Sequence, residues 1–219
     1  MLRRLAPIVA LLAAAPARAG DVVGAVRYAG APPHASPLEV TKDRETCGTS
    51  QPDEALLVVG GRLANVVVST GPVAGLPAAP SRGTLGQERC RFTPRVQVLP
   101  VGSTLEIVNG DPILHTATGQ LGKARAFDVP TPTQGERVPK VLQRPGLVRV
   151  ACDVHAWMRA FVWVLEGPAA VSGPDGAFRI AGLPAGSYTL TAWHETLGER
   201  TARVTVPPTG EARVEIVFE

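Results

Sequence analysis

The sequence predicts an all-β protein built from two β-sandwiches. Three observations carry this prediction. The 219 residues include 23 glycines and 21 prolines, and these separate short runs of β-branched and aromatic residues instead of forming tracts. Within the runs, apolar and polar residues alternate with the period of a half-buried strand. A chain of this length holds one large domain or two small ones.

The first 19 residues have the pattern of a secretory signal peptide. Residues 3 and 4 are basic, residues 5–15 are almost wholly apolar, and residues 17–19 form a small-x-small cleavage pattern. The apolar run is too short for the alternative, a membrane anchor, and no later segment approaches 18 unbroken apolar residues. We therefore expect an exported, periplasmic protein with no transmembrane segment after signal removal.

The charge of the mature chain is balanced. The full sequence has 22 basic and 19 acidic residues, and removal of the three arginines of the leader leaves 19 of each. The basic pI of about 9.0 therefore comes from the leader. The interleaved basic and aromatic residues of nucleic-acid-binding proteins are absent from the sequence, so we expect no nucleic-acid partner.

The first half of the mature chain alternates between strands and loops. Strands are predicted over residues 22–28, 56–59 and 63–69, where β-branched residues gather. Residues 31–54 are polar and contain prolines, so we expect irregular structure there. Residues 71–83 are rich in Pro, Ala and Gly and are predicted to be a linker or surface loop.

The middle of the chain has the clearest strand pattern. We predict strands over residues 96–98, 105–108, 147–151 and 160–165, each bounded by turn residues. Residues 119–143 are predicted to be rich in loops.

The last 50 residues predict a compact sandwich of short strands. The predicted strands cover residues 177–180, 188–193, 202–206 and 212–218, and Gly- and Pro-containing turns separate them. Alternation places the following residues on the apolar faces: Phe178, Ile180, Tyr188, Leu190, Val214 and Ile216.

One short loop carries three soft metal ligands. Cys152, His155 and Met158 stand at C-x₂-H-x₂-M, and Met158 is the only methionine besides Met1. Thiolate, imidazole and thioether together suit copper best. A hairpin would bring these three ligands to one rim, and an earlier strand would deliver His115, 37 residues before Cys152, to the same rim. Zinc is the alternative, but it leaves the methionine unexplained.

The remaining two cysteines are expected to form a disulfide. We pair Cys47 with Cys90, because an exported protein folds in an oxidising compartment and Cys152 is the predicted metal ligand. The alternative is that another pair forms, or none.

Residues 84–166 resemble the cupredoxins. The loop at 152–158 has the ligand spacing of amicyanin, and residues 92–109 are similar to the plastocyanin-like approach to the first histidine. There are two departures: Thr116 replaces the asparagine that commonly follows that histidine, and Val154 replaces a proline. The threonine hydroxyl can still form a hydrogen bond.

The resemblance implies a Greek-key β-sandwich with a type 1 (blue) copper site holding one ion, Cu(I) or Cu(II). His115, Cys152 and His155 would form the ligand plane, and Met158 would be the weak axial ligand. His155 would lie nearest the surface and serve as the electron port. Trp157 would be either a docking contact beside it or ordinary core.

The C-terminal residues resemble a second family, the carboxypeptidase regulatory-like domain, which is a smaller transthyretin-like sandwich. The motif lies at residues 175–190. Strands like those that open this family occur at 22–26 and 65–68, before the copper module, so we expect the cupredoxin domain to be inserted into this sandwich. The predicted division is 1–19 signal peptide, 20–83 N-terminal strands completing the regulatory-like sandwich, 84–166 cupredoxin domain and 167–219 regulatory-like domain.

These features predict an exported blue copper protein that carries single electrons between a donor and an acceptor, its redox protein partners. We expect no enzyme activity, because the chain has four histidines and two are committed to this site. One alternative is a periplasmic copper carrier or sensor without electron transfer, and another is a structural β-sandwich binding module. The pair His194–Glu195 is either a second metal or docking site or a solvated strand end.

Overall fold

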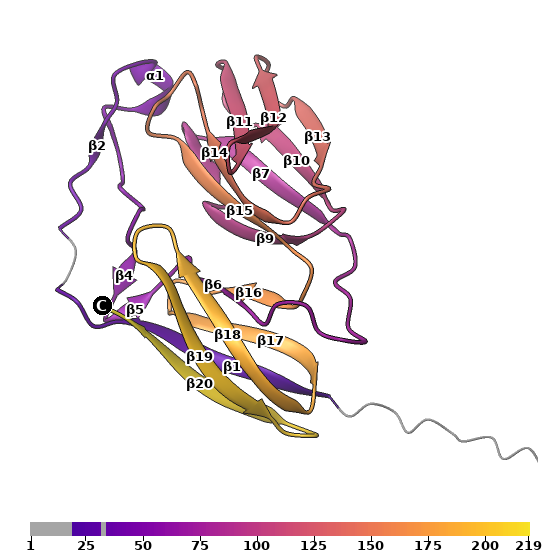
Figure 1. Ribbon diagram of the computed structural model, residues 1–219. Helices are drawn as coiled ribbons and strands as arrows, with labels where there is room; N and C mark the ends of the chain where they lie inside the picture. The colour runs from indigo at the N-terminus through magenta and orange to yellow at the C-terminus, as the bar shows by residue number, and fades with distance from the viewer. Residues whose placement is uncertain (1–18, 32–33) are drawn as a thin grey trace, which may run out of the picture.

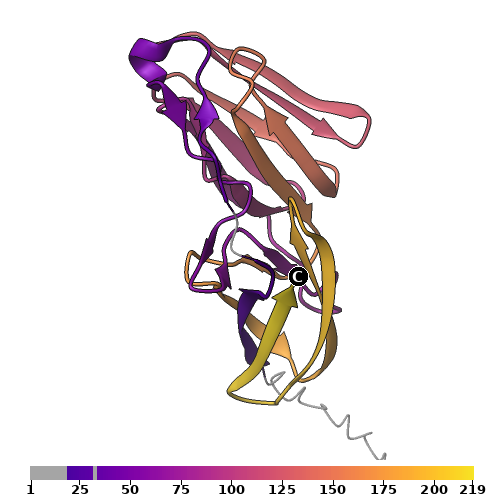
Figure 2. The same ribbon diagram turned by 90° about the vertical axis from the view of Figure 1, so that its left-hand side faces the viewer.

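The computed structural model describes residues 19–31 and 34–219, and the all-β class predicted from the sequence is confirmed. Two β-sandwiches form the molecule, a lower and an upper one in Figure 1. In the side view of Figure 2 they lie end to end. Residues 1–18 of the predicted leader lie outside the described residues. Within the described ranges, no helix has the length and apolar character needed to cross a membrane.

The lower sandwich combines strands from both ends of the chain. One sheet has the order β17-β1-β5-β4, with β20 also paired to β1, and the facing sheet has the order β16-β6-β18-β19. Alternating apolar residues of the two sheets pack into one core. The strands are β1 (Ala19–Tyr28), β4 (Val58–Val59), β5 (Arg62–Leu63), β6 (Val67–Ser69), β16 (Ala169–Val171), β17 (Ala177–Pro184), β18 (Gly186–His194), β19 (Gly198–Val206) and β20 (Glu211–Phe218).

β1 pairs with two strands from the C-terminal part of the chain. It runs antiparallel to β17 over residues 19–25 and parallel to β20 over residues 21–28. The chain leaves this sandwich after β6 and returns at β16, and these two strands pair with Ser69 opposite Ala169. The chain segment that forms the upper sandwich is therefore connected to the lower sandwich through two neighbouring strands, β6 and β16.

The upper sandwich consists of residues 82–165. One sheet has the order β13-β10-β7-β8 and the other the order β12-β11-β14-β15-β9. The pairs β7–β10 and β9–β15 are parallel, which requires a crossover connection for each. The strands are β7 (Arg82–Glu88), β8 (Arg91–Thr93), β9 (Val96–Pro100), β10 (Thr104–Asn109), β11 (His115–Leu121), β12 (Ala124–Thr131), β13 (Arg137–Val141), β14 (Gly146–Ala151) and β15 (Arg159–Leu165).

The prediction of a loop-rich segment over residues 119–143 is wrong, because β11, β12 and β13 occupy most of it. β12 buries Phe127, Val129 and Thr131 in alternation with exposed neighbours, but polar and turn-forming residues hide this period in the sequence. Gly119 is required by a close approach: a Cβ at this position would lie 2.5 Å from Cζ of Phe127. A glycine that reads as a turn signal thus marks a tightly packed strand.

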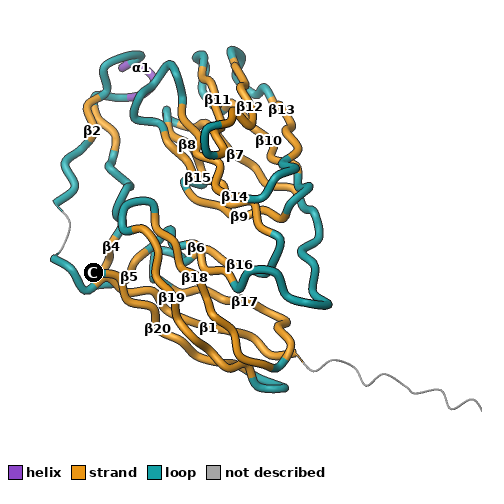
Figure 3. Tube along the Cα trace, viewed as in Figure 1, coloured by secondary structure: helices purple, strands orange, loops and turns teal. Residues whose placement is uncertain are grey.

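Residues 38–54, here called the strap, run from the lower sandwich to the far end of the upper one and back, mostly as loop (Figures 1 and 3). The predicted disulfide between Cys47 and Cys90 is confirmed, with the Cα atoms 5.3 Å apart. The buried side chain of Gln51 donates hydrogen bonds to the carbonyl oxygens of Cys47 and Arg89, at 2.6 and 3.0 Å. The strap is thereby fixed to the turn between β7 and β8. Its elements are β2 (Leu38–Glu39), α1 (Arg44–Cys47) and β3 (Ser50–Gln51).

The two sandwiches meet in a small interface. Trp193 of β18 packs against Phe161 and Trp163 of β15, with ring centroids 5.5 and 5.7 Å apart. Beside this aromatic group, Arg95 donates two hydrogen bonds to the carboxylate of Glu195, at 2.6 and 2.7 Å. The two side chains are only 13% and 7% exposed. This bidentate, nearly buried ion pair connects the sandwiches in a defined orientation.

His194, the residue between Trp193 and Glu195, is buried, and its ring centroid lies 6.3 Å from that of Phe218 in β20, so the alternative of a solvated strand end at His194–Glu195 is wrong. The Nδ1 atom of His194 accepts hydrogen bonds from the backbone amides of Thr196 and Leu197, at 3.3 and 3.4 Å. Burial, together with the charge of Arg95, lowers the pKa of His194 from 6.5 to about 4. The imidazole is therefore neutral near physiological pH.

We expect acid to destabilise the protein through His194. The unfolded chain protonates this side chain near pH 6.5 and the folded one near pH 4, so the unfolded state holds more protons between these values. The contribution of His194 to the free energy of unfolding must then fall as the pH drops through this window, by about 3 kcal/mol in full. Denaturant titrations of the metal-free protein between about pH 7 and about pH 4 measure this loss.

The matched variant is His194→Asn, because the asparagine Oδ1 can accept the same amide hydrogen bonds without titrating. It should lose less stability on acidification than the wild type, whereas exchange of the exposed His34 for asparagine should leave the wild-type pH dependence intact. Equal pH dependence in the wild type and His194→Asn would contradict the low pKa.

Candidate metal centre

The four predicted ligands gather at the end of the upper sandwich that faces away from the lower one. His115 is the first residue of β11, and Cys152 directly follows β14. His155 and Met158 lie in the turn that leads to β15. All four side chains are buried, with Met158 only 2% exposed. The antiparallel pairing of β11 with β14 and of β14 with β15 brings the three chain segments side by side.

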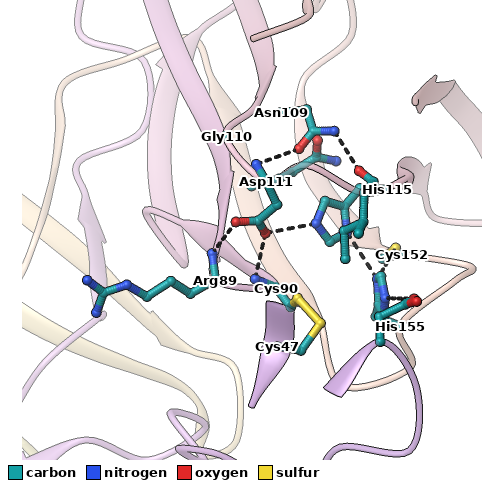
Figure 4. Close-up of polar contacts among 12 residues, drawn as sticks. Cys47, Arg89, Cys90, Asn109, Gly110, Asp111, His115, Cys152 and His155 are labelled. Carbon is teal, nitrogen blue, oxygen red and sulfur yellow. Dashed lines mark hydrogen bonds and ion pairs between the residues drawn. A yellow bond between two sulfur atoms is a disulfide. The ribbon is translucent and has the colours of Figure 1, made fainter. Parts of the chain in front are cut away.

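The donor atoms of three residues converge. Nδ1 of His115 and Nδ1 of His155 are 3.0 Å apart, and Nδ1 of His155 is 3.7 Å from Sγ of Cys152. Figure 4 shows the His115 ring between Asp111 on one side and the side chains of Cys152 and His155 on the other. Met158 closes the loop, since its backbone N–H donates to the carbonyl of His155 at 3.0 Å and its carbonyl accepts from the amide of Cys152 at 3.4 Å.

These residues fit a single transition-metal ion. Two donor atoms that share such an ion, each about 2.0–2.3 Å from it, lie about 3–4 Å apart, and the measured separations fall in this range. Two imidazoles, a thiolate and the thioether of a buried methionine in the same loop are a donor set that would suit copper. Zinc would bind the two imidazoles and the thiolate, but a thioether is not one of its usual ligands.

The environment of Cys152 favours the thiolate that metal binding requires. Burial raises the pKa of the thiol, but hydrogen bonding to His115 and to the backbone amides of Thr116, His155 and Val154 outweighs burial and lowers the pKa to about 6. The amide of Thr116 lies 3.4 Å from the sulfur. A proline at the position of Val154 would have no N–H to donate, so this departure from the cupredoxin pattern adds a donor to the sulfur environment.

Asp111 holds His115 from outside the cluster. Its Oδ2 lies 2.9 Å from Nε2 of His115 and accepts the amide N–H of Cys90 at 2.8 Å, while Oδ1 accepts the amide of Arg89 at 2.8 Å. Burial lowers the pKa of His115, but the hydrogen bonds and charges of Cys152 and Asp111 raise it above 6.5 overall. The carboxylate fixes Nε2 as the outward nitrogen and leaves Nδ1 for a metal.

Asn109 shapes the loop that carries Asp111. Its Oδ1 accepts the amide of Asp111 at 2.9 Å, and its Nδ2 donates to the carbonyls of Ile113 and Thr131, at 2.8 and 2.7 Å. The side chain is completely buried. One amide group therefore satisfies three backbone groups and holds the loop between β10 and β11 in the form that Figure 4 shows.

The expectation that His155 is the ligand nearest the surface is wrong, since Cys152 and Met158 are slightly more exposed. Its side chain is 0% exposed, because Asp43 of the strap covers it and places Oδ2 2.9 Å from Nε2 of His155. Asp43 precedes α1 in the left-handed conformation, with φ of 51°, and its side chain does not cap the helix. The carboxylate reaches the histidine instead. A non-glycine residue held in this conformation indicates a position fixed by its surroundings.

Thr116 links the two ligand loops. Its hydroxyl oxygen accepts the amide N–H of Asp153 at 2.7 Å and lies 3.7 Å from Sγ of Cys152. The expectation that a threonine at this position can form a hydrogen bond is confirmed. Trp157 is half-buried, with its ring centroid 5.1 Å from that of His155, and its indole N–H donates to the carbonyl of Cys90 at 3.0 Å.

Sequence reasoning missed the two carboxylates. Asp111 stands four residues before His115 in the loop that leads to β11, so only its closeness in the sequence points to it. Asp43 has no such signal, because 112 residues separate it from His155 and only the folded strap brings it there.

The chain matches no known family model and no curated protein, but parts of it are similar to solved structures. A purple cupredoxin from Nitrosopumilus maritimus is 20% identical with a TM-score of 0.34, over 38% of this chain and 98% of that one. Amicyanin from Paracoccus versutus (Thiobacillus versutus) is 20% identical with a TM-score of 0.34, over 45% and 96%. A copper-containing nitrite reductase from Thermus scotoductus SA-01 is 25% identical with a TM-score of 0.35, over 51% of this chain but 25% of that one.

We expect Thr116→Val to weaken the connection between the ligand loops. The variant keeps the amide that faces the sulfur but loses the hydroxyl that accepts the Asp153 N–H. A net hydrogen bond contributes about 1 kcal/mol, so the free energy of unfolding of the metal-free protein should fall by about that amount in a denaturant titration. The matched control is Thr104→Val, at a half-buried threonine of β10 whose hydroxyl bonds to no other described residue. Equal stability of both variants would contradict the role of Thr116.

Proposed function

We propose that the protein is an exported type 1 (blue) copper protein that carries single electrons between a redox donor and a redox acceptor. The observation that carries this proposal is the convergence of Nδ1 of His115, Nδ1 of His155 and Sγ of Cys152 in a buried site. The buried Met158 lies in the same loop, and its backbone is hydrogen-bonded to Cys152 and His155. Copper bound there would supply a one-electron couple, Cu(I)/Cu(II).

The chain supports this chemistry by holding the ligands still. Both histidine rings are fixed at Nε2 by carboxylates, and the sulfur is fixed by backbone amides. Ligands that are held in place by hydrogen bonds to surrounding groups move little when the charge of the metal changes. A small rearrangement between the two oxidation states lowers the barrier to electron transfer, and this favours an electron carrier.

The closed site favours this function over the alternatives. A copper carrier or sensor releases its ion, whereas His155 here is covered by the strap, and a disulfide holds the strap in place. Enzyme activity is also disfavoured, since His194 is buried beside Phe218 and only His34 is left for a second copper centre. The Cys47–Cys90 disulfide supports export, because such bonds persist in oxidising compartments such as the periplasm. The partners would be redox proteins.

Copper titration of the metal-free mature protein tests the proposal. The wild type should bind one Cu(II) ion and develop the intense visible band of a copper–thiolate bond. Cys152→Ser should lose this band, because serine supplies no thiolate. His34→Asn should keep it, since the exposed His34 lies outside the cluster. Colourless copper binding by the wild type would favour a carrier or sensor, and absence of binding would favour a structural module; either result would contradict the proposal.

A further inference from the structure

We infer that Asp43 of the strap, together with Asp111, sets the reduction potential of the metal centre by stabilising the oxidised ion. This inference rests on the proposed function, because it assigns a role toward copper bound by His115, His155 and Cys152. Asp43 is a positioning residue here: it acts on the metal through His155.

The two histidines are held in the same way. In each ring Nδ1 faces the sulfur, and Nε2 faces a carboxylate oxygen 2.9 Å away. A carboxylate that accepts the outer N–H of a ligating imidazole fixes the tautomer and makes the ring a stronger electron donor. Both histidines of this cluster therefore have a partner of that kind, and Figure 4 shows the one on His115.

The charge of the two carboxylates affects the reduction potential of the metal. A negative group close to the metal stabilises Cu(II) more than Cu(I), because the oxidised ion carries the higher charge. The strength of this effect depends on solvent access. The side chain of Asp111 is 9% exposed and that of Asp43 is 35% exposed, so water screens Asp43 more. Asp111 also accepts two backbone amides, whereas the carboxylate of Asp43 bonds to no described residue other than His155.

The fold holds Asp43 in this position. The backbone carbonyl of Asp43 accepts the amide of Cys47 at 2.9 Å, and Cys47 is bonded to Cys90. The amide of Cys90 in turn donates to Asp111. One disulfide therefore links the strap, which carries Asp43, to the turn that holds Asp111. The strap, which extends to the far end of the sandwich, places Asp43 against His155.

The test is the reduction potential of copper-loaded Asp43→Asn, measured by redox titration of the visible band. Asparagine keeps an acceptor for the His155 N–H and tolerates the left-handed backbone, but it removes the charge. Mutation of such an outer partner typically lowers metal affinity by about tenfold or more. A tenfold loss confined to Cu(II) raises the potential of a one-electron couple by about 59 mV, and a rise of that size is the expected result.

The matched control is Glu45→Gln, which removes one exposed carboxylate from α1 without contact to either histidine. Its potential should stay at the wild-type value. Asp111→Asn should raise the potential at least as much as Asp43→Asn, because the Asp111 carboxylate is less exposed.

The outcomes separate this inference from the proposed function. A wild type with the copper–thiolate band, and an Asp43→Asn potential that equals that of Glu45→Gln, would overturn the inference and leave the proposed function standing. A lower potential in Asp43→Asn would overturn it as well. A wild type that binds copper without the band would overturn the proposed function and, with it, the inference.

Discussion

The arrangement of the metal centre depends on one covalent constraint, the disulfide between Cys47 and Cys90. The two cysteines are 43 residues apart in the chain, so the bond closes a long loop and restricts the unfolded chain accordingly. In the folded protein it fastens the strap to the turn between β7 and β8. That turn supplies the amides that hold Asp111, and the strap supplies Asp43. Both histidines are thus oriented by groups that a single bond keeps together.

The disulfide and the strap bring several charged groups together at the site. A thiol whose pKa is lowered to about 6 and two carboxylates surround two imidazoles at the end of an apolar core. The Cys152 thiolate and the Asp111 carboxylate, which are largely removed from water, need a compensating charge nearby. A metal cation between Nδ1 of His115, Nδ1 of His155 and Sγ of Cys152 would supply that charge, and this physical requirement joins the fold to the proposed function. Because Asp43 covers His155, the strap lies between this imidazole and the solvent.

Local patterns in the sequence predicted what depends on local structure. The all-β class, the strands around Cys152 and the grouping of three ligands within seven residues follow from alternation and spacing, and the disulfide follows from elimination among three cysteines. The prediction failed over residues 119–143, where Gly119 and Thr131 read as loop residues although one allows a close ring contact and the other is buried in a strand. It also failed for the exposure of His155 and the environment of His194. These depend on residues that only tertiary structure brings near, Asp43 for the first and Arg95 for the second, and no periodicity encodes such contacts.

The most direct test of the central claim is a crystal structure of the copper-loaded protein, with anomalous scattering recorded at the copper edge. We predict a single copper peak bonded to Nδ1 of His115, Nδ1 of His155 and Sγ of Cys152, with the sulfur of Met158 beside it and Asp43 and Asp111 still on the outer nitrogens. A copper ion bound to either carboxylate, or to any group of atoms that leaves out the Cys152 sulfur, would contradict the account.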